Sequence, residues 1–377
     1  MEFYIETGEL QRAIKFLQVV AKVNEVGLPG RILIEANEDN SVEFTVNSKP
    51  IAITHLTRDV AVKTPGTISI LYSKIKSFVT LSAPWNGTYG TKGFLFVVYG
   101  QDIKVFSDTV YEDGRTSKGK LKLDYFDPQM TIKPKSFNQP SFILNSNIFK
   151  TALSKIIYAI DPGETRPSIQ GMNMRFDEEN IYFAGTNGYV LSEYKVKNIS
   201  NLTEGSFNLK YDYVMAVKRA VIEETQLFFE IDGGTIRTKF GDTCIYGSMV
   251  IGHLFPEYKK NLESFSDFVS LNKDVLSGIL IQFGDVLDSD DYNRLTFSIK
   301  DSKLSVYNDY AQFEYDGDIE YSNTFEIDVN GVNMHNTIDA IKDDSILVKF
   351  SDHKSSLIFD SANFQDQKAL ILPISRR

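Results

Sequence analysis

The sequence has few of the residues and segments that mark secreted or membrane proteins. It contains one cysteine, Cys244, and therefore cannot form an internal disulfide. No apolar run approaches the roughly 20 residues of a membrane-spanning helix, and the first residues lack the basic and apolar segments of an export signal. These absences predict a protein of a reducing cytoplasm with no membrane partner. Cys244 itself is expected to be a small buried strand residue.

Residues with catalytic chemistry are also scarce. The chain has four histidines at scattered positions, which are His55, His253, His335 and His353. None pairs with another at the spacing of a metal site or an acid–base pair. The acidic run at 288–291 lacks the glycine and terminal glutamate of a calcium loop, and no glycine-rich phosphate-binding motif occurs. The sequence therefore predicts no catalytic residue, no metal site and no cofactor, which argues against an enzyme.

Acidic residues outnumber basic ones by 50 to 40, which gives a formal net charge of −10. Proteins that bind nucleic acid over their whole surface are usually basic, so any such contact must come from local clusters of positive charge. Hydrophobic residues make up 42% of the chain, enough to bury cores, and 377 residues are more than one core usually organises. A folded chain of several domains follows.

A strand-like pair of apolar residues recurs six times, and a helical pattern follows it each time. The six pairs are Phe3/Ile5, Ile68/Ile70, Phe142/Leu144, Phe207/Leu209, Val269/Leu271 and Phe325/Ile327. Their average separation is about 64 residues. After each pair come a helix-capping residue, such as Asn272 or Asn330, and apolar residues spaced by three and four. This spacing is typical of a helix with one buried face.

Alternating strands joined by polar turns follow each predicted helix, as in hairpins. One such unit has a single helix to cover its sheet, so two units are expected to combine into one domain. Six units therefore predict an α+β chain of three domains, each made of two β-α-β-β-β repeats. The expected domains are 1–127, 128–253 and 254–377.

Three groups of residues add a family resemblance to this repeat. They are Arg-Pro-Ser-Ile-Gln-Gly-Met-Asn-Met-Arg-Phe at 166–176 with Ala-Gly-Thr-Asn-Gly-Tyr-Val-Leu at 184–191, Phe-Pro-Glu-Tyr-Lys-Lys at 255–260, and Leu-Ile-Leu-Pro-Ile-Ser-Arg at 370–376. Their order and spacing, together with the sixfold repeat, resemble the bacterial DNA sliding clamp, the beta subunit of DNA polymerase III. The first domain departs most from the family, which suggests a divergent member, phage-encoded or otherwise distant.

The resemblance implies both a fold and a role. Three clamp domains per chain would place helices on the inside of a ring and sheets on the outside. Two chains would close the ring as a homodimer around duplex DNA of any sequence. Such a ring is a processivity factor for DNA replication that binds the DNA polymerase and the clamp loader, in the cytoplasm of a bacterial or phage-infected cell. Its joint is expected at edge strands of the first and third domains, near Phe283, Val286 and Leu287.

Positive charge gathers on three of the six predicted helices. The helices that begin at Thr7, Ser73 and Ser146 each carry a net charge of +2, whereas the other three each carry −1. Lysine and arginine on a channel wall attract phosphates without reading sequence. The residues predicted to face DNA are Arg12, Lys15, Lys22, Lys74, Lys76, Lys150, Lys155, Arg166, Lys218 and Arg219.

The resemblance also implies a groove between the second and third domains, into which partner proteins insert a short peptide with apolar anchors. Carried over to the matching segments, the groove residues are Ile169, Thr186, Gly188, Tyr189, Val190, Leu191, Pro256, Lys260, Asn261, Leu370, Ile371, Leu372, Pro373, Ile374 and Arg376. Tyr189, Val190 and Asn261 depart from the family pattern, which puts the peptide preference in doubt. A chain cut after Phe364 is expected to stay folded and to lose peptide binding.

Alternative interpretations of these residues remain open beside the sliding clamp. The helix lysines fit ordinary solvated helix faces, and each apolar groove residue taken alone fits ordinary core packing. A different class of function also fits the repeats, namely a structural or interaction scaffold, for example viral, that uses strand edges and binds no DNA. Whether binding depends on the topology of DNA separates the two classes.

Overall fold

The structure is a computed structural model, and it describes residues 1–21, 30–48, 50–82, 89–111, 114–130, 133–284, 293–315, 319–321, 323–352, 354–363 and 366–374. The chain forms two compact units, which we describe separately. Unit 1 consists of Met1–Ser146 and Met215–Ser248, and unit 2 consists of Asn147–Val214 and Met249–Arg377. The domain boundaries expected after residues 127 and 253 stay a prediction.

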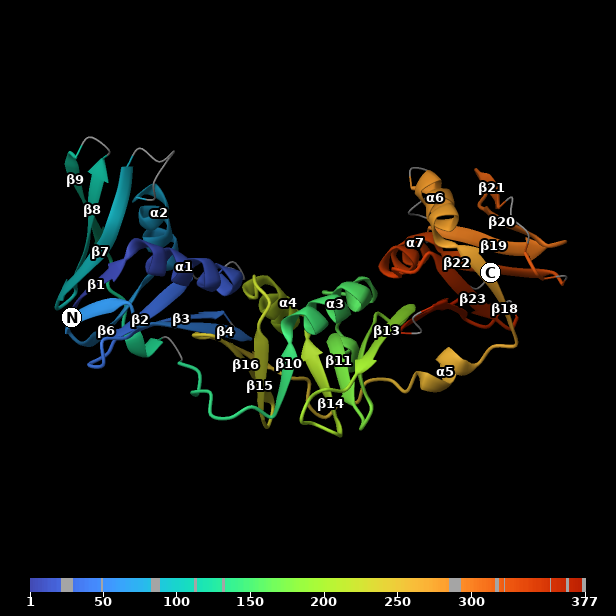
Figure 1. Ribbon diagram of the computed structural model, residues 1–377, viewed down its shortest axis with the longest axis horizontal. Coiled ribbons are helices and arrows are strands. Elements are labelled where there is room, and N and C mark those ends of the chain that lie inside the picture. Colours follow the sequence, from blue (N-terminus) through green and yellow to red (C-terminus); the bar gives the residue numbers. More distant parts are fainter. Residues whose placement is uncertain are drawn as a thin grey trace. The chain divides into compact units, whose positions relative to one another are not determined.

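Unit 1 contains two antiparallel sheets (Figure 1). Across the five-stranded sheet the order is β5 (Val60–Thr64), β1 (Glu2–Glu6), β7 (Tyr89–Tyr99), β8 (Asp102–Tyr111) and β9 (Thr116–Leu123). Across the eight-stranded sheet the order is β10 (Phe142–Asn145), β15 (Gln226–Asp232), β16 (Thr235–Phe240), β17 (Thr243–Ser248), β4 (Ile51–Thr57), β3 (Val42–Ser48), β2 (Arg31–Ala36) and β6 (Gly66–Leu71). Helices α1 (Thr7–Ala21) and α2 (Tyr72–Ser82) pack against each other in this unit.

Unit 2 also has an eight-stranded sheet, beside one of four strands. The larger sheet runs β14 (Gly205–Lys210), β11 (Gly171–Phe176), β12 (Asn180–Thr186), β13 (Val190–Lys197), β25 (Gln367–Ile371), β24 (Leu357–Ser361), β23 (Ser345–Phe350) and β18 (Asp267–Asn272). The smaller sheet runs β21 (Gln312–Tyr315), β20 (Lys303–Tyr307), β19 (Arg294–Lys300) and β22 (Phe325–Asn330). Its helices include α3 (Ser146–Ile156) from Asn147 on, α5 (Lys259–Glu263), α6 (Lys273–Phe283) and α7 (Gly331–Ala340), of which α6 and α7 lie side by side (Figure 1).

The six strand–helix pairs predicted from the sequence are confirmed. They are β1–α1, β6–α2, β10–α3, β14–α4, β18–α6 and β22–α7, where α3 is Ser146–Ile156 and α4 is Tyr211–Ala220. Two of the expected caps are formed: the side chain of Asn272 accepts a hydrogen bond from the Val275 amide, and that of Asn330 accepts one from the Asn333 amide. Short 3-10 turns lie at Pro128–Met130, Ile157–Ala159 and Pro167–Ile169.

Each eight-stranded sheet is built from two halves that meet at one pair of strands. In unit 1 the halves meet where β4 pairs with β17, and in unit 2 where β13 pairs with β25. The two strands of each pair are far apart in sequence, so local sequence patterns cannot predict that they pair. The seam between β13 and β25 is the part of the fold that positions the candidate site.

The ring joint expected near Phe283, Val286 and Leu287 stays a prediction, but Phe283 itself does not lie at the surface. Phe283 is fully buried in the core of unit 2, where its ring packs edge-on against Phe313 at a centroid distance of 4.9 Å. Val286 and Leu287 lie outside the residues that the structure describes. Phe283 therefore stabilises the fold of unit 2 and presents no surface to a partner.

Cys244 is a buried residue of β17, as the sequence predicts. Burial raises the pKa of its thiol to about 12, so the thiol is protonated at neutral pH. A protonated, buried thiol is a poor nucleophile, and Cys244 therefore acts as a small core residue.

His55 makes the stability of unit 1 dependent on pH. Its ring is 4% exposed, its Nδ1 lies 2.9 Å from the Thr243 hydroxyl, and burial lowers its pKa to about 4. A proton would place a second N–H in the core, where Nε2 has no partner among the described residues. Because the unfolded chain binds this proton more tightly, the stability from neutral His55 is present above about pH 6.5 and is lost as the pH falls towards 4.

We therefore expect acid to destabilise the unchanged chain more than a His55→Gln variant. The difference in the free energy of unfolding should grow by roughly 3 kcal/mol between pH 6.5 and pH 4, since each pKa unit corresponds to about 1.4 kcal/mol. Urea unfolding at several pH values measures it. Parallel pH profiles for the two chains would show that other groups control the acid sensitivity.

Candidate functional site

The seam between β13 and β25 exposes different side chains on its two faces. Val190 lies opposite Ile371, and Leu191 lies opposite Leu370. Neighbouring strand residues point to opposite faces of a sheet. Leu191 and Leu370 accordingly belong to a small apolar cluster with residues of and next to α5, whereas Val190 and Ile371 belong to the large core that includes α6 and α7. The candidate groove can therefore use only one face of the seam.

A short segment around α5 covers that face. Tyr258 and Leu262 are buried against Leu191 and Leu370, and the cluster also contains Ala184, Ile358 and Phe255. The helix begins where the amides of Asn261 and Leu262 donate to the Tyr258 carbonyl. Lys260 and Asn261 stay exposed on this segment. The family-like residues at 255–260 thus bring Lys260 and the following Asn261 to the seam.

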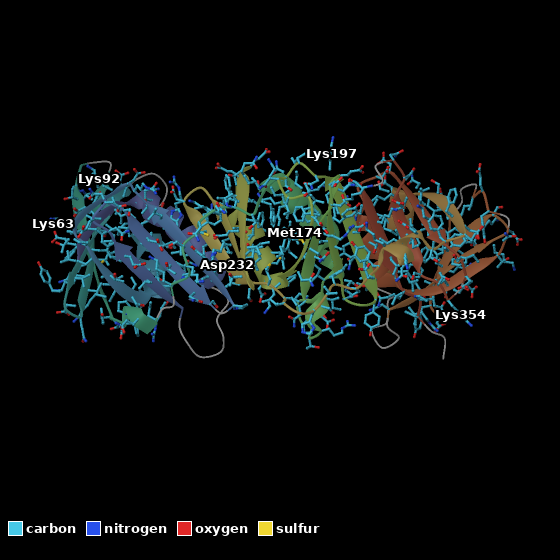
Figure 2. All side chains as sticks on the ribbon, turned by 90° about the horizontal axis from the view of Figure 1, so that it is seen from below. Lys63, Lys92, Met174, Lys197, Asp232 and Lys354 are labelled. Atoms are coloured by element: carbon cyan, nitrogen blue, oxygen red, sulfur yellow. The ribbon has the colours of Figure 1, made fainter. Side chains whose placement is uncertain are left out.

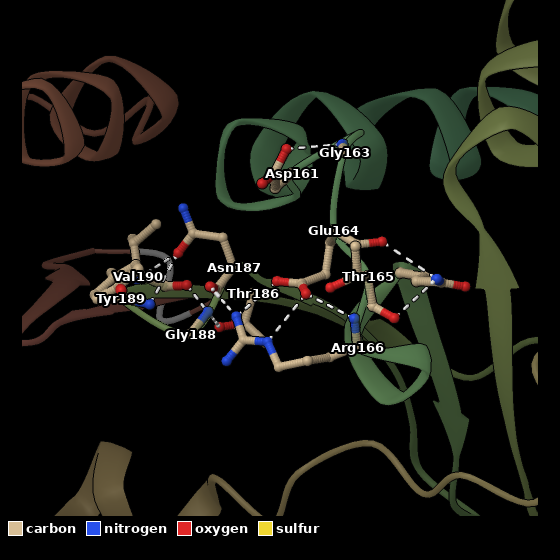
Figure 3. A network of polar contacts seen from close by, with 11 residues as sticks. Asp161, Gly163, Glu164, Thr165, Arg166, Thr186, Asn187, Gly188, Tyr189 and Val190 are labelled. Atoms are coloured by element: carbon tan, nitrogen blue, oxygen red, sulfur yellow. Dashed lines mark hydrogen bonds and ion pairs between the residues drawn. The ribbon is translucent and has the colours of Figure 1, made fainter.

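The turn between β12 and β13 is fixed by its own side chains. The Asn187 side-chain oxygen accepts from the amides of Tyr189 and Val190, at 2.9 and 3.0 Å. The Thr186 hydroxyl donates to the Val190 carbonyl at 2.7 Å and accepts from the Gly188 amide at 3.0 Å. These bonds, drawn in Figure 3, hold Tyr189 at the tip of the turn with its side chain 69% exposed.

Arg166 braces this turn from outside. Its guanidinium donates to the Asn187 carbonyl at 2.7 Å and pairs with Glu164 at 2.6 Å (Figure 3). Hydrogen bonds from Arg166 lower the pKa of Glu164 to about 2, so the pair is charged on both sides at neutral pH. Gly188 has a φ of +90°, and a Cβ there would lie 2.8 Å from the guanidinium nitrogens. Arg166 thus stabilises the turn, and because it is also exposed, its expected contact with DNA stays a prediction.

The open end of the seam carries exposed apolar surface. The Leu372 amide donates to the Tyr189 carbonyl at 2.9 Å, which joins the chain after β25 to the turn. Leu372 is 42% exposed, and Pro373 and Ile374 are half-buried. The Ile374 amide donates to the Asp328 carbonyl at 2.8 Å and holds this segment to β22. Apolar side chains beside main-chain polar groups are what a short peptide needs to bind.

The predicted groove residues divide by exposure. Those at the surface or partly exposed are Gly188, Tyr189, Pro256, Lys260, Asn261, Leu372, Pro373 and Ile374. Those with buried side chains are Ile169, Thr186, Val190, Leu191, Leu370 and Ile371. The prediction that Val190 and Ile371 line the groove is wrong, because both side chains pack into the core on the opposite face of the sheet. Arg376 lies outside the described residues.

The residues predicted to face DNA also divide. Arg12, Lys15, Lys74 and Arg219 are exposed, Lys76, Lys150 and Lys218 are half-buried, and Lys22 lies outside the described residues. The prediction that Lys155 faces DNA is wrong. Lys155 is 5% exposed, and its ammonium donates to the Ala340 carbonyl at the end of α7, at 2.8 Å. Burial lowers its pKa to about 8, so it stays protonated at neutral pH and serves as a structural donor.

Two contacts that hold the α5 segment were missed from the sequence. The Tyr258 hydroxyl donates to Glu193 at 2.6 Å, and Lys259 lies over the ring of Tyr182. Along β13, Glu193 shares a face with Leu191, Lys195 and Lys197, so strand alternation predicts an exposed side chain, and the sequence holds no signal that Glu193 is buried. Within the described ranges no group of acidic, histidine or cysteine side chains could hold a metal ion, and no helix is long and apolar enough to span a membrane.

Known proteins share this architecture. No family model matches the chain. The chain is 22% identical over 228 residues to the beta sliding clamp of Buchnera aphidicola subsp. Acyrthosiphon pisum, a similarity that covers 59% of this chain and 62% of that protein. Over the full length of both chains its fold matches the DNA polymerase III subunit beta of Pseudomonas aeruginosa, with a TM-score of 0.85 and 15% identity. It also matches the Helicobacter pylori beta clamp bound to a DNA ligase peptide over both full lengths, with a TM-score of 0.79 and 15% identity. The chain thus has the fold of the beta sliding clamps, and its sequence is similar to that of a bacterial clamp over 59% of its length.

Proposed function

We propose that the chain is a DNA sliding clamp, a processivity factor that encircles duplex DNA as a homodimeric ring. It would tether the replicative DNA polymerase and the clamp loader in the cytoplasm of a bacterial or phage-infected cell. The observation that carries the proposal is the full-length agreement in fold with DNA polymerase III beta subunits. The role depends on topology and on binding, and it involves no catalysis and no cofactor.

The exposed cations of α1 and α2 support contact with DNA. Lys15 and Lys74 reach solvent, and Arg12 pairs with Glu9 on an exposed helix face. An exposed ion pair is weak, so a phosphate can displace the carboxylate. Such contacts neutralise phosphates without reading bases, which suits a ring that has to move along any sequence.

The open end of the seam supports peptide binding. The Helicobacter pylori clamp is bound to a DNA ligase peptide, and we assign the same class of ligand to this groove. Tyr189 and Leu372 would contact apolar side chains of the peptide, and exposed Lys260 would favour an acidic residue in it.

Two edge strands support closure of the ring by a second copy. Among the described strands, β9 of unit 1 and β21 of unit 2 are each paired on one side. Lys118, Lys120 and Lys122 are exposed on β9, whereas β21 exposes Glu314. A row of lysines discourages pairing with most strands, and an acidic edge relieves the repulsion. We therefore assign the joint to β9 of one copy and β21 of the other.

Retention of the protein on circular DNA tests the proposed function. Clamp protein loaded on a nicked circular plasmid should elute with the DNA in gel filtration, and linearising the plasmid should release it, because a ring slides off free ends. Binding that survives linearisation would overturn the topological mechanism. Absence of binding to both forms would favour a scaffold that does not act on DNA.

The helix lysines provide a second arm of the same experiment. Replacing Lys15, Lys74 and Lys150 together by glutamate should lower the retained fraction about tenfold at 0.1 M salt, since each lost phosphate contact weakens binding. A matched control reverses Lys92, Lys197 and Lys354, three exposed lysines outside the helices (Figure 2). Equal losses in the two triple variants would show that overall charge, and not the helices, governs retention.

A further inference from the structure

We propose that Tyr258 is a positioning residue for peptide binding: through its hydrogen bond to Glu193 it fixes α5 over the seam, and α5 presents Lys260 and Asn261 to the peptide. The inference rests on the proposed peptide-binding function of the groove. Tyr258 itself is buried and would not touch the peptide.

The bond between Tyr258 and Glu193 is short and buried. The hydroxyl donates to a Glu193 carboxylate oxygen at 2.6 Å, and the two residues are 7% and 8% exposed. Burial and the nearby Glu193 charge raise the pKa of Tyr258, so the hydroxyl keeps its proton and donates. Burying a carboxylate without a hydrogen-bond donor costs much free energy. The Glu193 carboxylate therefore strongly favours the position of Tyr258 in which the hydroxyl donates to it.

Tyr182 provides a second hold on the same helix. The Arg175 guanidinium lies 3.9 Å from the centre of the Tyr182 ring, and the Lys259 ammonium lies 4.3 Å from it. Arg175 and Tyr182 are cross-strand neighbours on β11 and β12, so the ring has a fixed place on the sheet. The first residue of α5 is thereby held to the sheet by cation–π contact.

These contacts matter because α5 cannot fix its own position. Isolated helices of fewer than about 12 residues are marginal in water, and α5 has five. Leu262 anchors its far end against Leu191 and Leu370. The hold at 258–259 therefore decides how Lys260 and Asn261, which follow directly, are presented at the surface.

A Tyr258→Phe variant of the full chain tests the proposal. Phenylalanine keeps the ring that packs edge-on against Phe255 at 5.8 Å and removes only the hydroxyl. With the DNA ligase peptide as the fluorescent probe, the Kd should rise about tenfold, as expected for one buried hydrogen bond. Tyr194→Phe, a matched change of a half-buried tyrosine on β13, should leave the Kd unchanged.

A double-mutant cycle separates positioning from a general effect on the fold. If Tyr258 acts through α5, then Tyr258→Phe should cost little further affinity once Lys260 and Asn261 are both alanine, but should cost its full tenfold in a Tyr189→Ala background. Glu193→Gln, which keeps an acceptor, should lose less affinity than Glu193→Leu. Additivity in both backgrounds would overturn the proposal.

A second variant covers the case in which Tyr258→Phe does not fold. Tyr182→Leu removes the aromatic ring that contacts Lys259 and should raise the Kd severalfold with an unchanged circular dichroism spectrum. Binding of the peptide by the unchanged chain and by Tyr258→Phe with equal Kd would overturn the positioning role alone. Failure of the unchanged chain to bind the peptide would overturn the peptide-binding function on which the inference rests.

Discussion

A chain in which Lys118, Lys120 and Lys122 are all glutamate is expected to be a monomer of 42.7 kDa, whereas the unchanged chain should have twice that mass. The reversal places three carboxylates on the β9 edge, opposite the acidic β21 edge of a second copy. Like charges that face each other across paired strands are destabilising, and a joint made of one strand pair has few other contacts to offset them. Light scattering after size-exclusion chromatography measures the mass directly.

The reciprocal variant makes this test specific for the joint. A chain with Gln312→Lys and Glu314→Lys has a basic β21 in addition to its unchanged basic β9. It should also be monomeric. Mixed in equal amounts, the two variants should form a dimer: the reversed β9 meets the reversed β21 at one joint, the two unchanged edges meet at the other, and the charges are opposite at both. Two variants that stay dimeric alone, or a mixture that stays monomeric, would place the joint at other strands.

The repeat architecture could be predicted from the sequence because each of its signals is local. Alternation of apolar residues in pairs such as Phe325 and Ile327 marks a strand, and a cap such as Asn330 followed by spacing of three and four marks a helix. All six strand–helix pairs are present at the predicted places. Local patterning and tertiary structure agree here, as expected where burial on one face drives both.

The roles that were predicted wrongly depend on partners far away in sequence. Lys155 has the charge of a DNA-facing residue, but its ammonium reaches the carbonyl of Ala340 in another helix. A count of charge on a helix cannot show such contacts, because a lysine stem beside the apolar stripe can point either way.

The groove shows how strand periodicity refines a resemblance. Matching segments identified a run of neighbours, including Leu370, Ile371 and Leu372, as one surface. In a strand these alternate, and Ile371 accordingly lies in the core on the other face from Leu370. Helix α5 escaped prediction for a different reason: five residues are too few to show a helical period, and its place depends on Tyr258 and Glu193.

A chain that ends at Ile371 is expected to bind the DNA ligase peptide about a hundredfold more weakly than the unchanged chain while keeping its fold. The cut removes Leu372, Pro373 and Ile374, the apolar residues at the open end of the seam, and leaves β25 complete. Losing several contacts at the centre of a small interface typically costs roughly 2–3 kcal/mol, which corresponds to this change in affinity. Fluorescence anisotropy gives the Kd.

The position of the cut decides what the experiment means. A cut after Phe364, which the sequence alone suggests, removes β25, a strand paired with β13 on one side and β24 on the other, together with buried Ala369, Leu370 and Ile371. Loss of this inner strand is expected to unfold unit 2, so a loss of binding after this cut would not report on the groove. A chain that ends at Ile374 is the matched control: it keeps the apolar residues and lacks Arg376. If it binds as weakly as the chain ending at Ile371, the residues after Ile374 carry the affinity and the assignment to Leu372, Pro373 and Ile374 fails.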